Sequence, residues 1–121
     1  MRKLIFIVLF LATSSCYSQR YFAQLKNDTV QKVIVVESME RAYQLFGGTW
    51  VETYMNTPNK NYAGVGFVYH WDKQNFEPVK PYPSWVLDSL LHWQSPVSKP
   101  DTINPWIWDE SKKNWKSYFD K

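Results

Sequence analysis

Three short segments in the second half of the chain repeat one pattern: large residues in alternation, then an aspartate, then another aromatic residue a few positions later. The segments are Tyr69-His70-Trp71-Asp72, Trp85-Val86-Leu87-Asp88 and Trp106-Ile107-Trp108-Asp109. Alternating large side chains suit strands whose aromatic residues face a partner strand, and aspartate opens tight turns. The pattern predicts a β-hairpin in each copy, with a helical turn as the alternative for the middle one.

The links between these copies are rich in proline. Proline fixes its own φ and biases the preceding residue toward extended chain. We therefore expect stiff, extended links rather than flexible ones. The copies form a degenerate repeat that is too short for a solenoid. The prolines concerned are Pro78, Pro81, Pro83, Pro96, Pro100 and Pro105.

The first half predicts a sheet with one helix. Two β-rich runs, 20–26 and 30–36, flank the turn signal Asn27-Asp28-Thr29 and predict a hairpin, and 48–55 predicts a third strand. Between them, 37–46 predicts a helix that Ser38 can cap and that ends before Gly47. Its apolar stripe is expected in the core and comprises Met39, Ala42, Tyr43 and Phe46.

The expected fold class is α+β and mainly β: an N-terminal antiparallel sheet with one helix, followed by Trp-rich β-hairpins joined by Pro-rich extended links. A chain of 121 residues has room for one core. We expect 20–68 to form the sheet and helix, and 69–121 to form the hairpin region of the same single domain. In the loop 56–66, Gly64 and Gly66 indicate backbone positions that a side chain would obstruct.

The N-terminus has the three parts of a secretory signal peptide. Two basic residues precede the apolar run 4–12, and a small polar stretch follows. Residues 1–19 are predicted to be a signal peptide, because the run is too short for a permanent membrane anchor; a buried helix or strand is the alternative. Cleavage is expected near Gln19 or Arg20, with lipidation of Cys16 as the other outcome. Either outcome predicts an extracytoplasmic location: periplasmic, secreted or surface.

The net charge argues against a nucleic-acid partner. From Arg20 onward there are 12 Lys and Arg against 11 Asp and Glu, a net charge of +1. Nucleic-acid binding requires clustered basic surface. Membrane contact is expected only through the leader or a lipid on Cys16. Edge strands and stacked hairpins allow self-association.

Seven tryptophans follow the leader, and two interpretations apply to them. Aromatic side chains bury large areas, so most of them are expected to form a dense core. The alternative is an exposed platform that stacks on a protein or glycan surface. The candidates for such stacking are Trp106, Trp108 and Trp115, because little chain remains to cover the last hairpin.

The sequence favours a non-enzymatic protein without a cofactor or a metal. His70 and His92 have no partner at metal-ligand spacing, and the recurring aspartates are explained by turns. A second hypothesis is a small secreted or lipid-anchored envelope protein, either a hydrolase or an inhibitor of cell-wall enzymes. A carboxylate near His70, or two close carboxylates in a cleft, would support it. An open sheet without a cleft would count against it.

Most of the chain from 21 to 115 resembles a group of small uncharacterised proteins of marine tailed phages, including cyanophages. The resemblance implies a phage-type accessory or virion-associated protein and carries over no catalytic or binding residues. The group begins at about Tyr21, without a leader. The matching segments are 21–25, 33–36, 45–50 and 60–67, then Lys80-Pro81, 84–88, Trp93 with Pro96 and Pro100, and Trp108-Asp109-Glu110 with Trp115.

Overall fold

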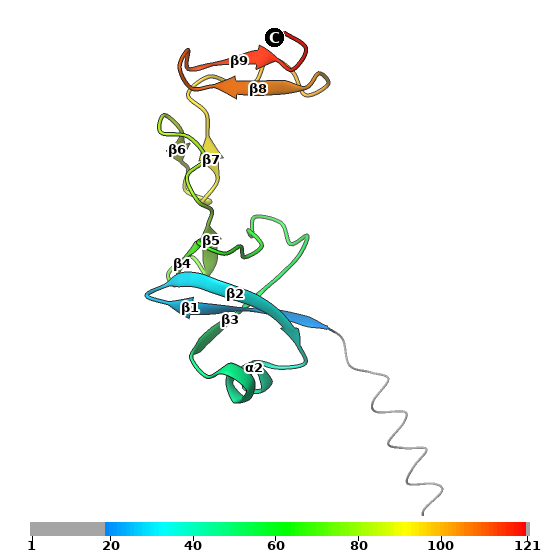
Figure 1. Ribbon diagram of the computed structural model, residues 1–121, viewed down its shortest axis with the longest axis vertical. Helices are drawn as coiled ribbons and strands as arrows, with labels where there is room; N and C mark the ends of the chain where they lie inside the picture. Colours follow the sequence, from blue (N-terminus) through cyan, green and yellow to red (C-terminus); the bar gives the residue numbers. More distant parts are fainter. Residues whose placement is uncertain (1–18, 121) are drawn as a thin grey trace, which may run out of the picture.

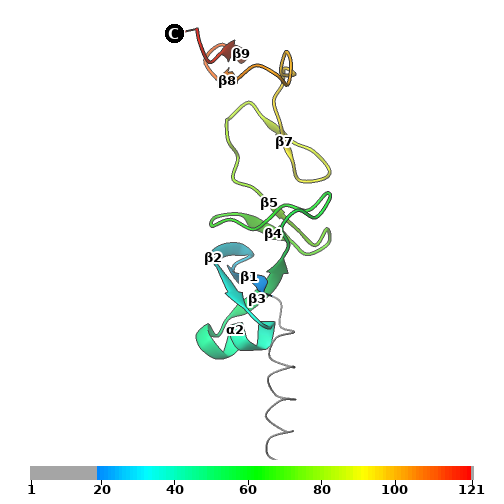
Figure 2. The ribbon, with the colours of Figure 1, turned by 90° about the vertical axis from the view of Figure 1, so that its right-hand side faces the viewer.

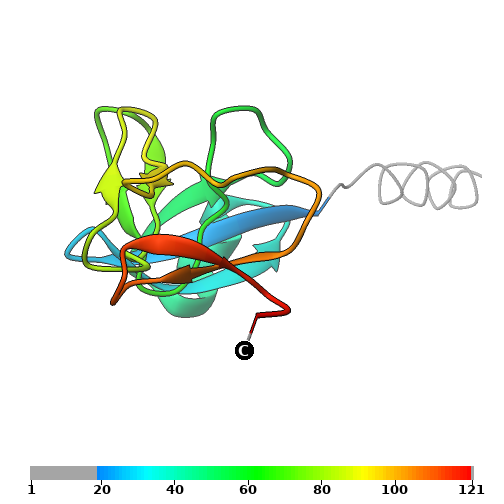
Figure 3. The same cartoon turned by 90° about the horizontal axis from the view of Figure 1, so that it is seen from above.

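The computed structural model describes residues 19–120. The candidate lipidation site Cys16, and all of the predicted signal peptide except Gln19, lie outside the described residues. The chain forms a column: a sheet with one helix lies at one end, and two further hairpins follow toward the C-terminus (Figure 1). Figure 2 shows the same order from the side, and Figure 3 shows the last hairpin lying over the sheet when seen from above.

Five antiparallel strands make the sheet, in the order β3-β1-β2-β4-β5. Asn27 and Asp28 turn the chain between β1 and β2 with φ of 51° and 61°, the left-handed region that these two residue types tolerate. The strands are β1 (Arg20–Lys26), β2 (Thr29–Val36), β3 (Thr49–Thr53), β4 (Val68–His70) and β5 (Asn75–Glu77).

Both faces of the sheet are covered. Alternate side chains of β1 point to opposite sides and pack in two separate clusters. Phe22 packs with Trp50 and Ala42 on the side of helix α2 (Met39–Phe46). Ala23 and Leu25 pack on the other side, in a cluster with Val30, Val51, Ala63 and Phe76. The loop between β3 and β4 supplies Ala63, so this loop covers the face that the helix leaves open.

Helix α2 begins at Met39, two residues later than predicted, because Ser38 is its N-cap. The Ser38 hydroxyl accepts a hydrogen bond from the Arg41 amide at 3.1 Å. Only Ala42 of the predicted apolar stripe is buried, whereas Met39, Tyr43 and Phe46 are 45%, 62% and 51% exposed. The prediction of a core stripe is therefore wrong. This short helix contacts the sheet through its smallest apolar residue, and the longer side chains lie around that contact.

The glycine predictions are confirmed in the loop between β3 and β4. A Cβ atom at Gly64 would lie 2.9 Å from the Phe67 ring, and Gly66 has a φ of 89°. Neither position accepts an ordinary side chain without strain. The amide of Ala63 donates to the Thr53 hydroxyl at 2.8 Å, which attaches this loop to β3.

All three aromatic-Asp segments form hairpins, so the predicted fold class is confirmed. The first hairpin, β4–β5, joins the five-stranded sheet through the pairing of Thr29 with Val68. The second pairs β6 (Val86–Leu87) with β7 (Trp93–Gln94), and the third pairs β8 (Trp106–Asp109) with β9 (Asn114–Ser117). The helical-turn alternative for the middle copy is wrong. No helix within residues 19–120 is long and apolar enough to cross a membrane.

Aspartate opens the turns of the last two hairpins. The Asp88 carboxylate accepts hydrogen bonds from the amides of Leu90 and His92 at 2.9 and 2.8 Å. The bond from the His92 amide is the main cause that lowers the Asp88 pKa. Asp109 accepts from the Ser111 hydroxyl and the Lys112 amide in the same way. The middle copy departs most from the others in sequence, but its aspartate still binds the backbone of the turn.

Candidate functional site: an aromatic groove between two hairpins

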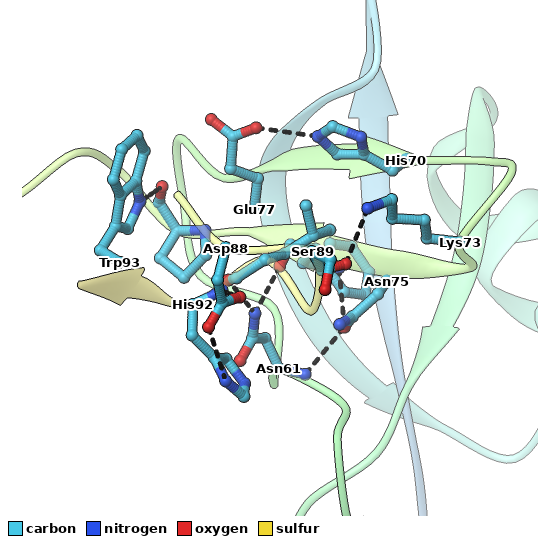
Figure 4. Close-up of polar contacts among 12 residues, drawn as sticks. Asn61, His70, Lys73, Asn75, Glu77, Asp88, Ser89, His92 and Trp93 are labelled. Atoms are coloured by element: carbon cyan, nitrogen blue, oxygen red, sulfur yellow. Dashed lines mark hydrogen bonds and ion pairs between the residues drawn. The ribbon is translucent and has the colours of Figure 1, made fainter. Parts of the chain in front are cut away.

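The second hairpin is attached to the sheet by side chains that bind its turn (Figure 4). The Lys73 ammonium donates to the Ser89 carbonyl at 2.7 Å. The side-chain nitrogens of Asn75 and Asn61 donate to the next two backbone carbonyls, those of Leu90 at 3.4 Å and Leu91 at 2.9 Å. Three consecutive carbonyls of the turn are therefore bound by the sheet and its loop, which fixes the position of the hairpin.

Asn75 is the central residue of this junction and is only 4% exposed. Its side-chain oxygen accepts from the amides of Asn61 and Phe76, at 2.8 and 2.9 Å. Its side-chain nitrogen donates to the Asn59 carbonyl at 3.3 Å in addition to that of Leu90. Sequence reasoning missed this residue, because a polar residue after a turn gives no sign that it will be buried.

Aromatic packing attaches the third hairpin to the second. The rings of Trp85, Trp108 and Trp115 lie 5.3 to 6.0 Å apart in edge-to-face arrangements. Glu110 joins the same elements, since its carboxylate accepts from the Ser84 amide and hydroxyl and from the Trp108 indole. These hydrogen bonds, that from Trp108 first, lower the pKa of Glu110.

Exposure separates the three predicted stacking residues. Trp108 is only 5% exposed, so the expectation that it is exposed is wrong: Trp85, which the second hairpin contributes, covers its ring. Trp106 is half-buried, and its indole nitrogen lies 3.4 Å from the Asp101 carboxylate. Trp115 is half-buried as well and lies beside a groove. A stacking role stays a prediction for Trp106 and Trp115.

An aromatic groove of about 380 Å³ lies between the second and third hairpins. Three half-buried indoles from different segments meet there, and only one of them, Trp115, was predicted as a stacking residue. Polar side chains from β7 and the following link complete the lining. The lining residues are Trp85, Trp93, Trp115, Gln94, Ser95, Ser98 and Lys99.

Two Trp–Lys pairs repeat the same arrangement beside this groove. The Trp93 indole donates to the Pro78 carbonyl at 2.7 Å, and the Lys80 ammonium lies 5.6 Å from the centre of its ring (Figure 4 shows the indole bond). The Trp115 indole donates to the Val97 carbonyl at 2.8 Å, and the Lys99 ammonium lies 5.1 Å from its ring. In each pair, one Pro-rich link supplies both the carbonyl and, two residues later, the lysine.

The indoles are thus fixed at their edges, while the lysines are held weakly. A cation–π contact at an exposed site contributes only about 0.5–1 kcal/mol. Within residues 19–120, neither lysine forms an ion pair with a carboxylate. Both ammonium groups can therefore turn toward an anionic group without breaking a strong contact.

Two polar side chains of the groove have no hydrogen-bond partner among the described residues. In the described part of the chain, no hydrogen bond engages the Ser98 hydroxyl or the Lys99 ammonium. A cavity of about 360 Å³ against the sheet is lined by Thr53, Asn61 and Asn75 among others. These three side chains bind the backbone of the protein itself. Thr53, Asn61 and Asn75 are therefore already engaged within the protein, whereas Ser98 and Lys99 of the groove are not engaged by a hydrogen bond among the described residues.

Both histidines lie beside a carboxylate. His70 Nε2 is 2.8 Å from Glu77 Oε1 across β4 and β5, and His92 Nδ1 is 4.0 Å from Asp88 Oδ2 (Figure 4). Asp88 is already engaged by its turn. His70 and Glu77 are not part of the lining of the cavity against the sheet. Within residues 19–120, no group of three His, Cys, Asp or Glu side chains is placed to hold a metal ion.

No protein-family model, curated protein or solved structure matches this chain.

Proposed function

We propose that the protein is a non-enzymatic binding module that acts outside the cytoplasm and holds a glycan in the aromatic groove. The observation that carries this proposal is the meeting of three indoles from separate segments with the Ser98 hydroxyl and the Lys99 ammonium, which no hydrogen bond engages among the described residues. Ligand sites are commonly lined by aromatic side chains with a few polar groups that fix orientation. The groove has this composition.

A sugar suits such a surface better than a purely apolar ligand does. The face of an indole carries partial negative charge, which attracts the C–H bonds on the flat side of a sugar ring. The hydroxyl groups of the sugar then need partners at its rim. Ser98, Lys99 and the side-chain oxygen of Gln94 lie where they can supply them, while the Gln94 nitrogen already donates to Asp88.

The leader and the sequence resemblance support a role for this binding outside the cytoplasm. The basic, apolar and small-residue parts of 1–19 support export from the cytoplasm. The resemblance to marine tailed-phage proteins supports an accessory or virion-associated protein that contacts a cell surface. A protein surface is the other ligand that the exposed aromatic residues would fit.

Filling the groove without removing any tryptophan tests the proposal. In Ser98→Leu, an exposed groove residue becomes bulky and apolar; Thr102→Leu, at an exposed position in the same link that does not line the groove, is the matched control. Binding to immobilised peptidoglycan and a panel of polysaccharides is measured on the full chain. We expect Ser98→Leu alone to abolish binding, with unchanged near-UV circular dichroism. Binding that survives Ser98→Leu, or binding to no glycan, would refute the proposal.

A second candidate function is a small envelope hydrolase, and the His70–Glu77 pair is the observation that favours it. A histidine within hydrogen-bond distance of a carboxylate is a common acid–base arrangement. Clearing of a peptidoglycan suspension by the protein, lost in His70→Gln, would establish this function. An unchanged suspension would leave the pair with a structural role, since it joins the two strands of the first hairpin.

A further inference from the structure

Beyond binding glycans in general, we propose that the aromatic groove binds a linear polysaccharide that carries carboxylate groups. One sugar would lie at Trp93 with Lys80, and a second at Trp115 with Lys99. This inference rests on the proposed function and names its ligand class. It is carried by the two Trp–Lys pairs, which place a flat aromatic face and a cation together twice at the border of one groove.

The geometry of each pair fits a uronic acid. The indole is held at its nitrogen by a backbone carbonyl, so its ring keeps its position while the flexible lysine can move. The carboxylate of a uronic acid is attached directly to a ring carbon. A sugar stacked on the indole therefore brings its carboxylate close to an ammonium group that already lies 5.1 to 5.6 Å from the same ring.

Neighbouring acidic side chains do not compete for these lysines. Asp88 is engaged by the amides of Leu90 and His92 and by the Gln94 side chain. The Glu110 carboxylate is engaged by donors from two other residues. Among the described residues, the lysine ammonium groups thus have only aromatic rings as partners near the groove.

The two equivalent positions indicate a polymer. Trp93 belongs to the second hairpin and Trp115 to the third, and the two strands that carry them, β7 and β9, follow one another along the column (Figure 1). Both indoles line the same groove. A ligand with regularly spaced sugars would engage both pairs, whereas a single sugar would engage one.

Single-stranded nucleic acid is the other polymer that combines stacking with negative charge. It binds in grooves where positive charge follows the whole backbone. Here the groove itself is lined by a single charged residue, Lys99, with Lys80 beside it. Two separate lysines, each near its own indole, match carboxylates on stacked sugars better than they match a continuous phosphate backbone.

The test compares acidic polymers with their neutral methyl esters. Polygalacturonate and alginate are each compared with their methyl esters, in which the carboxylates are neutral, by affinity electrophoresis and tryptophan fluorescence of the full chain at low salt. We expect the esters to bind roughly ten-fold more weakly, and added salt to weaken only the acidic forms. Lys80→Ala and Lys99→Ala should each weaken binding of the acidic forms several-fold, while the charge-matched control Lys112→Ala, in the turn of the third hairpin, should not.

The outcomes separate this inference from the function on which it rests. Equal binding of acid and ester, with both abolished by Ser98→Leu, would overturn the charged ligand and keep the glycan groove. The same holds if only uncharged polysaccharides bind. Binding of no polysaccharide would overturn both proposals. Tighter binding of oligothymidylate than of either acidic glycan would also overturn the inference, in favour of nucleic acid.

Discussion

The buried indole nitrogen of Trp85 allows a sharp test of how the aromatic cluster is stabilised. It is the one buried side-chain nitrogen or oxygen in the described part of the chain without a hydrogen-bond partner. Its neighbour Trp108, with ring centres 5.8 Å apart, donates instead to Glu110 at 2.7 Å. Trp85→Phe and Trp108→Phe therefore make the same chemical change in one cluster, but only Trp108→Phe breaks a hydrogen bond.

The two variants should differ clearly in stability. Leaving a buried donor unpaired costs about 1–3 kcal/mol, and Trp85→Phe removes that cost. The loss of ring volume is common to both variants, and it weighs more heavily at the more deeply buried Trp108. We therefore expect Trp108→Phe to lower the free energy of unfolding by about 2 kcal/mol more than Trp85→Phe does.

Urea unfolding followed by the near-UV circular dichroism of the tryptophans measures this difference. Equal m values in the two variants would show that the free energies can be compared. For a domain of about 100 residues, a difference of about 2 kcal/mol corresponds to roughly 8–16 °C in Tm. Equal costs, or a larger cost for Trp85→Phe, would refute the conclusion that hydrogen bonding distinguishes the two indoles.

Three further predictions concern the junction, the loop and the last link. Asn75→Ala should lower the free energy of unfolding by about 2–4 kcal/mol in urea titrations, because two backbone amides lose their acceptor. Gly64→Ala should cost about 1–3 kcal/mol in the same assay, since the new methyl group meets the Phe67 ring. Hydrogen bonds from the Asn104 backbone and side chain hold the pKa of Asp101 at about 2, so this carboxylate stabilises the fold above its ordinary pKa of 3.8, and the contribution is lost as pH falls toward 2. A carboxyl-carbon NMR titration with a midpoint near 3.8 would contradict this.

The hairpins could be predicted from the sequence because their signals are local. Alternation of large residues and an aspartate at the turn are read within about ten residues, and both act through neighbouring backbone. The position of Trp108 in a core could not be predicted in this way. Its burial depends on Trp85, which contacts it only because the segment between β7 and β8 brings the two hairpins together.

For the helix, too, local features could be predicted from the sequence, whereas its packing could not. The end of the helix before Gly47 was predicted, and so was the cap at Ser38, although the predicted range began two residues too early; both caps act within one turn of backbone. The spacing of Met39, Tyr43 and Phe46 identified one helical face, but how much of that face is covered is decided by the sheet. Here the contact is made at Ala42, and the sequence pattern carries no information on that point.

One part of the site did have a sequence signal. Two of the groove's tryptophans, Trp93 and Trp115, lie in the second strands of their hairpins. Each is preceded in the chain by a similar segment, Pro78-Val79-Lys80 for Trp93 and Pro96-Val97-Ser98-Lys99 for Trp115. Counted back from each lysine, the residue two positions earlier supplies the carbonyl that the indole binds. The similarity of the two links was visible in the sequence, whereas the indole that each link would meet depended on the hairpin pairing.

The groove lies between the second and third hairpins, where the third hairpin is attached to the rest of the chain. An isolated two-stranded hairpin is marginally stable in water, so the second and third hairpins depend on what attaches them. Side chains from the sheet and its loop bind the turn of the second hairpin, whereas the third is attached through three indoles and Glu110. A ligand in the aromatic groove would contact β7 of one hairpin and β9 of the other. Because a ligand that binds only the folded form stabilises it, glycan binding and the docking of the last hairpin should be coupled.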